Sequence, residues 1–201
     1  MVSIVARSVA ATAQTERELP GVKRLGSDQL RTFDQFYQRE FAPMVSLACT
    51  ICGDYQQGED LAQEAMARAH SNWERIVEFD KPGAWVRRVT TNLALSRVRR
   101  LKREVKALRR IGTRPDSPTA PSAERVAELQ FDTEVWDAVR QLPPRQRAVV
   151  GLFYQEDLST GDIAELLGCS VSTATSHLNQ ARQQLARHLE TTSVEAKEVA
   201  R

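Results

Sequence analysis

Three sets of residues in this 201-residue chain have types and spacings that could support chemistry. Cys49 and Cys52 form a CxxC pair, the spacing used for zinc binding and for thiol exchange. The segment 81–110 is dense in lysine and arginine, a composition suited to a polyanion. The segment 157–189 contains many short hydrogen-bonding side chains, which suit the edges of nucleic-acid bases.

The cysteine pair is better explained by packing than by metal chemistry. A zinc site needs about four ligands, and neither a second CxxC nor a nearby HxxxH is present. The pair lies in the apolar helical pattern of residues 44–52, and an odd count of cysteines does not suggest a disulfide framework. We therefore expect Cys49 and Cys52 to be small packed or half-exposed residues, and Cys169 to have a structural role in a turn. We expect no metal and no cofactor.

The basic segment indicates a nucleic-acid partner. Its only acid is Glu104, and so many like charges repel one another unless a polyanion neutralises them. Phosphate contacts that release counterions supply that gain. A solubilising surface helix is the alternative, but such a helix normally carries both signs of charge. The basic residues are Lys81, Arg87, Arg88, Arg97, Arg99, Arg100, Lys102, Arg103, Lys106, Arg109 and Arg110.

Aromatic residues lie immediately upstream of or among these bases, at Trp73, Phe79 and Trp85. Aromatic rings can stack the bases of a single strand whose phosphates are held by nearby cations. We expect both tryptophans to be core anchors. Phe79 lies in an expected loop, where it could pack or could shape a pocket for a base taken out of its stack.

The elements that must position these groups are helices. Apolar residues recur at spacings of three and four along most of the chain, so we predict an all-α fold. Pro43 is expected to kink or divide the first helix, and Gly53 to end it. The expected helices cover about 28–51, 58–73, 84–110 and 123–141, with another after Pro144 and a loop over 76–83.

The clearest domain boundary is the sequence GTRPDSPTAPS at 112–122, because prolines among small polar residues do not form a packed element. We therefore predict two small helical domains joined by a flexible linker. The expected organisation is a disordered tail over 1–27, a first domain over 28–110, a linker over 111–127, a second domain over 128–190 and a C-terminal tail over 191–201.

The second domain is predicted to contain a helix-turn-helix. Ser159 followed by Asp162 resembles a capping box, Gly168 suits the left-handed end of a short helix, and Ser170 can cap the next helix. A helical hairpin with a solvated polar face is the alternative. In the longer helix the apolar stripe is Ala174, Leu178, Ala181, Leu185 and Leu189. The stripe leaves Ser172, Thr173, Thr175, Ser176, Asn179 and Gln180 outward, where they could read base edges in a major groove.

Composition is that of an ordinary soluble protein, with 41% apolar and 27% charged residues and a net charge of +2. No apolar run approaches the roughly 18 to 20 residues needed to cross a bilayer. The mildly apolar start, residues 1–13, is short and interrupted by Ser3, Arg7 and Ser8, so we do not interpret it as a signal peptide. We expect a cytoplasmic protein without membrane insertion.

Three segments resemble the extracytoplasmic-function sigma factors, in particular their compact actinobacterial subgroup. GEDLAQEAMARAHSNW (58–73) is similar to the core-binding helix of sigma region 2. PGAWVRRVTTNLALSRVRRLKRE (82–104) is similar to the minus-ten recognition segment, and residues 142–185 are similar to region 4. The order and spacing of the three motifs make the resemblance specific, and it covers about 28–189 apart from the linker. It implies a non-catalytic protein that brings RNA polymerase to promoters.

The resemblance also implies a role for individual residues. The clamp helices of the polymerase beta-prime subunit would meet Glu59, Asp60, Gln63 and Glu64, and the beta flap would be a further contact. The melted minus-ten strand would meet Phe79, Lys81, Arg87, Arg88, Asn92, Arg97 and Arg100, with the 76–83 loop capturing a flipped base. The minus-thirty-five duplex would meet Ser172, Thr173, Thr175, Ser176, Asn179 and Gln180, with Arg182 on the DNA backbone. The family also suggests an anti-sigma factor as a partner.

The chain departs from the family pattern in its recognition helix. Ser172 stands where the family usually has a glycine, and Thr175, His177 and Gln180 stand where it has basic residues. An acidic residue often found at Ser96 is also missing. We therefore expect a neutral recognition helix with weaker minus-thirty-five binding, and we transfer no known consensus.

Two other classes of protein compete with this interpretation. A conventional helix-turn-helix repressor or activator would bind duplex DNA without polymerase, as a dimer on a palindrome. A nucleic-acid enzyme with a helix-turn-helix tail would need a metal-binding carboxylate cluster or an activated nucleophile. The acids of this sequence lie mostly on expected helix surfaces with no His or Ser constellation beside them, so we expect no enzyme.

Overall fold

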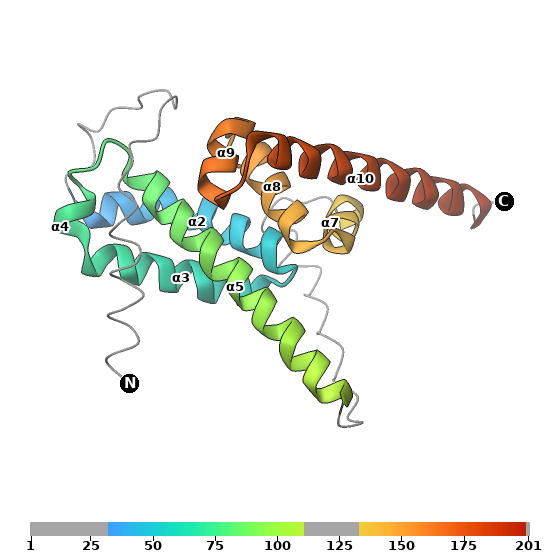
Figure 1. Ribbon diagram of the computed structural model, residues 1–201, viewed down its shortest axis with the longest axis horizontal. Helices are drawn as coiled ribbons and strands as arrows, with labels where there is room; N and C mark the ends of the chain where they lie inside the picture. The colour runs from blue at the N-terminus through green and yellow to red at the C-terminus, as the bar shows by residue number, and fades with distance from the viewer. Residues whose placement is uncertain (1–31, 111–132, 200–201) are drawn as a thin grey trace.

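The computed structural model of this protein describes residues 32–110 and 133–199. Within that part every regular element is a helix (Figure 1), which confirms the all-α prediction. The predicted tail over 1–27, the whole predicted linker over 111–127 and the first part of the helix expected at 123–141 lie outside the described residues. The helices are α2 (Phe33–Cys52), α3 (Tyr55–Ser71), α4 (Trp73–Ile76), α5 (Pro82–Arg110), α7 (Thr133–Gln141), α8 (Pro144–Tyr154), α9 (Thr160–Leu167) and α10 (Val171–Val199).

Helix α2 is continuous through Pro43, so it is not divided there as the sequence had suggested. Proline removes one backbone hydrogen bond from a helix interior. The loss of this hydrogen bond is offset because Phe36 and Leu47, which lie on either side of Pro43 in the helix, are fully buried in the same core. The helix ends at Gly53, whose φ of 73° is the left-handed conformation expected of a C-terminal glycine.

Helices α2, α3 and α5 form the first domain. The α3 helix begins at Tyr55, three residues before the predicted start, because the Asp54 side chain caps it by accepting a hydrogen bond from the Gln57 amide at 2.9 Å. Gly58 lies directly against Cys49 of α2, so no side chain fits between the two helices there. Trp73 packs on Phe36 with ring centroids 4.8 Å apart, and Trp85 packs on the same core, which confirms both tryptophans as core anchors.

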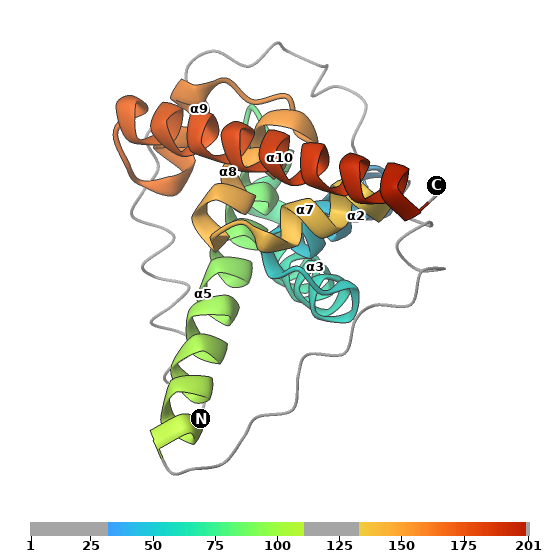
Figure 2. The same cartoon turned by 90° about the vertical axis from the view of Figure 1, so that its right-hand side faces the viewer.

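Helices α7 to α10 form the second domain, and it packs against the first. The buried side chains of Leu152 and Ile163 belong to the same hydrophobic cluster as Phe36 and Met44. Figures 1 and 2 show α8 and α9 beside the first domain, whereas the C-terminal halves of α5 and α10 project away in different directions. Helix α10 continues to Val199, through most of the segment predicted as a C-terminal tail.

The cysteine pair lies in the core of the first domain, as the packing interpretation required. Cys49 is fully buried, Cys52 is half-buried, and the described residues contain no group of three or more His, Cys, Asp or Glu side chains that could hold a metal ion. Burial raises the pKa of the Cys49 thiol far above its usual range and raises the pKa of Cys52 to about 12. Cys169 lies in the bend between α9 and α10, as expected.

These pKa values predict slow alkylation of both core thiols. Only the thiolate reacts, and a pKa raised from 9.0 to about 12 lowers the thiolate fraction at mildly alkaline pH by about a thousandfold. We expect iodoacetamide to modify Cys49 and Cys52 at least about tenfold more slowly in the native chain than in the urea-unfolded chain. Mass spectrometry of the alkylated peptides measures both rates, and equal rates in the two states would contradict the buried placement.

Candidate nucleic-acid interface

The helix-turn-helix predicted from the sequence is present. Ser159 Oγ accepts from the Asp162 amide at 3.2 Å and donates to Asp162 Oδ2 at 2.6 Å, which starts α9. Gly168 ends α9 with a φ of 64°. Ser170 Oγ then accepts from the Thr173 amide at 3.2 Å, so α10 begins two residues after the turn. These local contacts fix the angle at which α10 leaves the domain.

The face of α10 that points away from the domain is polar. Ala174, Leu178 and Ala181 are buried, and Leu185 packs against the small cluster formed by Leu142 and Val150. Of the residues predicted to read DNA, Thr175 is half-buried and the others are exposed, namely Ser172, Thr173, Ser176, Asn179, Gln180 and Arg182. The structure therefore brings the predicted residues together on one surface of one helix.

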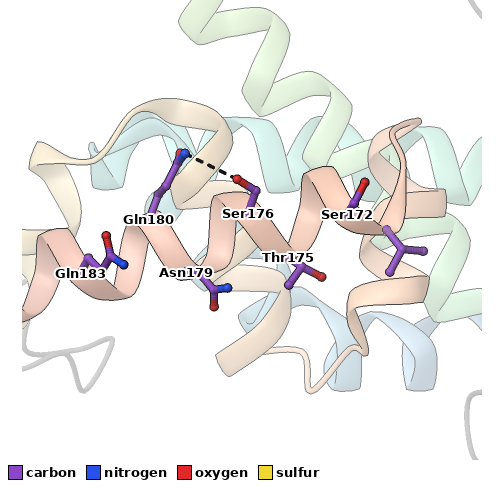
Figure 3. A pocket seen from close by; sticks show the side chains of 7 residues that line it. Ser172, Thr175, Ser176, Asn179, Gln180 and Gln183 are labelled. Atoms are coloured by element: carbon purple, nitrogen blue, oxygen red, sulfur yellow. Dashed lines mark hydrogen bonds between the residues drawn. The ribbon is translucent and has the colours of Figure 1, made fainter.

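An open groove of about 610 Å³ runs along this face (Figure 3). Its lining adds two residues that the sequence interpretation missed, Val171 and Gln183. Gln183 lies one helical turn after Asn179 on the same outward side of α10. The i, i+4 spacing could therefore have identified it from the sequence. The hydroxyl of Thr173 is partly engaged, because it lies 2.8 Å from Ser170 Oγ in the helix cap.

Residues of α8 hold two of the side chains predicted to contact DNA in place. Gln146 Nε2 donates to Gln180 Oε1 at 3.2 Å. Arg182 Nε donates to the Tyr154 hydroxyl at 2.8 Å, and its guanidinium also lies 5.1 Å from the centre of the Phe153 ring. No local sequence pattern indicates these contacts, because they join residues about thirty positions apart. They reduce the rotamer freedom that Gln180 and Arg182 would lose on binding.

The basic helix α5 divides into a packed half and a projecting half. Val86 and Ala94 are buried in the core, and Asn92 is exposed. Three of the predicted phosphate-binding arginines have partners within the chain. Arg87 Nε pairs with Glu156 at 2.6 Å, and Arg97 Nε donates to Gln57 at 3.2 Å. Arg100 pairs with Glu104 at 3.3 Å, and because both side chains are more than half exposed, that pair contributes little.

The remaining residues predicted to bind the minus-ten strand lie at the start of α5 and in the loop before it. Lys81 and Arg88 are half-buried. Phe79 lies between α4 and α5 and is also half-buried, packed against the main hydrophobic cluster. The ring is therefore packed on one side and remains partly accessible on the other. The loop itself runs from Val77 to Lys81, shorter than the predicted 76–83, because α5 already begins at Pro82.

A separate acidic surface lies on α3. Asp60, Gln63 and Glu64 are exposed and Glu59 is half-buried, while Leu61, Ala65 and Met66 on the opposite side of the helix are buried. Glu64 forms an exposed ion pair with Arg68 one turn later. The four predicted polymerase-binding residues therefore share one solvent-facing side of a helix whose other side is fixed in the core.

Comparison with known proteins identifies the two halves. Residues 36–104 match the family model described as sigma-70 region 2, and residues 132–185 match the model for sigma-70 region 4. An RNA polymerase sigma-E factor of Streptomyces antibioticus is 33% identical over 148 residues, which cover 74% of this chain and 79% of that protein. The chain belongs to the sigma-70 family. It is an extracytoplasmic-function sigma factor, and it directs promoter-specific initiation by RNA polymerase.

Two further relatives agree with this assignment. The sigma factor SigM of Mycobacterium tuberculosis is 30% identical over 157 residues, covering 78% of this chain and 76% of SigM. The solved structure of the Bartonella quintana sigma factor RpoE, in complex with the anti-sigma factor NepR, shares the fold. Its TM-score is 0.62 at 22% identity, over 79% of this chain and 96% of RpoE.

Membership of this family decides between the competing classes. A sigma factor is a non-catalytic subunit of RNA polymerase, so this chain is neither a nucleic-acid enzyme nor a repressor that acts without polymerase. Within residues 32–110 and 133–199, none of the helices has the length and apolar character required to span a membrane.

The α10 surface predicts two different mutational effects. A side chain that reads a base edge contributes about 1–3 kcal/mol of discrimination, whereas the loss of a phosphate contact weakens binding to all sequences equally. We expect Asn179→Ala to lower the preference for the cognate upstream element by about five- to 150-fold. We expect Arg182→Ala to leave that preference unchanged and to reduce the salt slope of binding by about one.

The measurement is competition binding of the polymerase holoenzyme to duplexes with cognate and scrambled upstream elements, across a range of salt concentrations. Gln183→Ala is the control, because Gln183 lies at the far end of the same groove. If bases are read only by the N-terminal part of α10, this variant should keep the preference for the cognate duplex. If Asn179→Ala weakened binding to cognate and scrambled duplexes alike, the base-reading assignment of this residue would be wrong.

Proposed function

We propose that this sigma factor holds promoter DNA at two places while the acidic surface of α3 docks on polymerase. In this proposal α10 reads the minus-thirty-five duplex and α5 holds the melted minus-ten strand. The observation that carries the proposal is the segregation of three surfaces in one chain: a groove on α10 lined mainly by uncharged polar residues, a basic helix α5 and an acidic side of α3.

The minus-thirty-five element is assigned to the outward residues of α10. Ser172, Thr175, Ser176, Asn179 and Gln180 line the groove and carry donors and acceptors suited to base edges in a major groove. Thr173 and Arg182 would contact the DNA backbone. Since these groove residues carry no charge, specificity here depends on hydrogen bonds rather than on charge, and the gain from phosphate contacts is small.

The minus-ten strand is assigned to α5 and the loop before it. Asn92 is exposed and would contact the melted strand, while Lys81, Arg87, Arg88, Arg97 and Arg100 would hold its phosphates. The loop containing Phe79 would receive a flipped base beside the aromatic ring, at a cost of a few kcal/mol for unstacking. The half-buried position of Phe79 supports a role as the floor of such a site rather than as a freely exposed stacking platform.

The polymerase contacts are assigned by charge. Glu59, Asp60, Gln63 and Glu64 would meet the beta-prime clamp helices, and the second domain would meet the beta flap. Work with polymerase and chromosomal DNA implies a cytoplasmic location. An anti-sigma factor is a further proposed partner, and the fold that this chain shares with a sigma factor solved in such a complex supports it.

The experiment that tests the proposal is run-off transcription with purified bacterial core polymerase across a randomised promoter library. We expect transcripts only when the chain is added, from templates enriched in two elements at a fixed separation. Core polymerase alone is the control. Transcripts from templates that share a downstream element and no upstream element would refute the role assigned to α10.

A further inference from the structure

Gln146 of α8 lies where α8 packs on α10. Leu142 and Val150, four residues before it and four residues after it, are buried together with Ala181 of α10 in one small hydrophobic cluster. Gln146 is itself only 6% exposed, so its polar amide lies beside apolar side chains. A buried amide is unfavourable unless it is hydrogen-bonded. The partner of Gln146 is Gln180, one of the residues that line the groove on α10.

The contact determines which end of the Gln180 amide faces the groove. Gln146 Nε2 donates to Gln180 Oε1 at 3.2 Å, so the oxygen of Gln180 is directed at α8 and its nitrogen away from that contact. The reverse arrangement would bury the N–H groups of Gln146 at the position of its oxygen, which has no hydrogen-bond partner among the described residues. Unpaired buried N–H groups are rarer in proteins than unpaired carbonyl oxygens, so the observed arrangement is the less costly one.

Gln180 therefore presents hydrogen-bond donors to the groove. Its Nε2 carries two N–H groups, and this nitrogen lies 3.5 Å from Ser176 Oγ (Figure 3). A serine hydroxyl that accepts a hydrogen bond still has its own O–H to donate. The groove around Ser176 and Gln180 is thus rich in donors, although a glutamine with a free amide donates and accepts equally well.

Bases differ in whether they offer an acceptor to such a donor. In the major groove guanine and thymine present the carbonyl oxygens O6 and O4, whereas adenine and cytosine present the amino groups N6 and N4. A free glutamine suits adenine, because it accepts from N6 while it donates to N7. A glutamine whose oxygen is held by a buried partner cannot do so, and an N–H group that faces an amino group leaves both without an acceptor.

We propose that Gln146 determines the base specificity of α10 without touching DNA, by holding Gln180 as a donor that selects a keto base, guanine or thymine, over an amino base, adenine or cytosine. This inference rests on the proposed role of α10 in reading the minus-thirty-five duplex. Gln146 is a positioning residue, since its buried side chain acts only through Gln180.

The first test locates the base pair that Gln180 reads and measures the preference there. The full-length chain, bound to core polymerase, is used in competition binding to duplexes in which each upstream base pair is replaced in turn by the other three. The base pair at which Gln180→Ala abolishes discrimination is the one that Gln180 reads. At this pair we expect the wild-type chain to favour a keto base over either amino base by at least about fivefold, the lower limit of a good base contact.

Gln146→Met is expected to reduce this ratio to less than about twofold. Methionine is similar in length but has no N–H group, so it frees the oxygen of Gln180 and lets the amide turn toward adenine as well. The change should be confined to one base pair. In the double variant Gln146→Met should add nothing to Gln180→Ala, because the two residues act through a single contact. Gln141→Met, the same change at an exposed position of α7, is the matched control and should keep the wild-type ratio.

A second variant reverses the preference and leaves the buried position intact. Gln180→Glu changes an exposed side chain, and its carboxylate can still accept from Gln146 but has no N–H group to present. We expect its preference to invert toward an amino base. The added negative charge weakens binding to every duplex, so the ratio between duplexes is the quantity that is compared. Thermal unfolding controls for Gln146→Met, which removes a buried unpaired oxygen and should not lower the unfolding temperature.

The contact itself is tested without DNA or polymerase. In the free full-length chain, hydrogen exchange of the Gln146 side-chain amide, measured by NMR, should be about three- to tenfold faster in Gln180→Ala than in the wild type. The reason is the loss of one hydrogen bond that protects this amide. Equal exchange rates in the two chains would show that the two amides do not meet.

Several results of the binding experiment would overturn the inference. An amino base preferred by the wild type at the Gln180 pair would show that the Gln180 oxygen faces the DNA. An unchanged ratio in Gln146→Met, or altered ratios at every base pair, would show that Gln146 does not set the specificity of Gln180. Discrimination that persists at all pairs in Gln180→Ala would show that Gln180 reads no base. A holoenzyme without preference at any upstream pair would refute the proposed function of α10, whereas the exchange measurement would still report the contact.

Discussion

Reversing two charges on α3 is expected to abolish binding to core polymerase. Asp60→Lys with Glu64→Lys turns an exposed acidic surface into a basic one that would face basic clamp helices. Like charges placed across an interface cost several kcal/mol, so we expect the affinity for core polymerase to fall by at least about 100-fold. Fluorescence anisotropy of labelled chain titrated with core polymerase measures the change, and its salt dependence should weaken in parallel.

The fold should survive this change because both side chains point into solvent, opposite the buried side of α3. The variant also loses the exposed ion pair of Glu64 with Arg68, which contributes only a few tenths of a kcal/mol. Glu165→Lys on α9 is a control of the same kind, an exposed acid reversed outside α3. Full binding by the α3 variant, or equal loss in the control, would refute α3 as the docking surface.

The parts of the fold that followed from the sequence are those encoded locally. Ser159, Gly168 and Ser170 cap and break the helices around the turn through contacts within four residues, so the helix-turn-helix was predictable in detail. The buried stripe of α10 followed from its spacing of three and four. The acidic side of α3 followed in the same way, because a helical period assigns exposed and buried positions together.

Contacts between distant residues were beyond the reach of the sequence patterns. Nothing local connects Gln146 to Gln180 or Tyr154 to Arg182, because each pair is created by packing of α8 on α10. The continuity of α2 through Pro43 has the same origin, since tertiary burial on both sides outweighs one lost backbone hydrogen bond. The Asp54 cap, by contrast, is a local signal. It places the start of α3 three residues earlier in the chain than predicted.

The density of basic residues in α5 also gave no indication of which arginines have partners within the chain. Sequence alone presents Arg87, Arg97 and Arg100 as equivalent bases in a run of one sign. In the folded chain their partners are Glu156, Gln57 and Glu104, and only the first of these is both charged and buried. Competition for phosphates therefore differs among the three arginines, being strongest at Arg87 and weakest at Arg100.

Neutralising three arginines of α5 is expected to weaken binding to the minus-ten strand by about 100-fold. The change is Arg88→Gln, Arg97→Gln and Arg100→Gln, which spares the buried pair of Arg87. Each phosphate contact to a single strand adds about 0.7 to the salt slope, which corresponds to about fivefold in affinity at ~0.1 M salt. Three lost contacts should therefore reduce the slope by about two and should prevent stable promoter opening by the holoenzyme.

The measurement is anisotropy of a labelled minus-ten single strand titrated with holoenzyme at several salt concentrations, alongside permanganate footprinting of the opened promoter. Arg39→Gln, Arg68→Gln and Arg75→Gln form the matched control, because they remove the same total charge from α2, α3 and α4. The control should retain both the slope and promoter opening. An equal loss in the two triple variants would mean that net charge, and not the face presented by α5, determines how the strand is held.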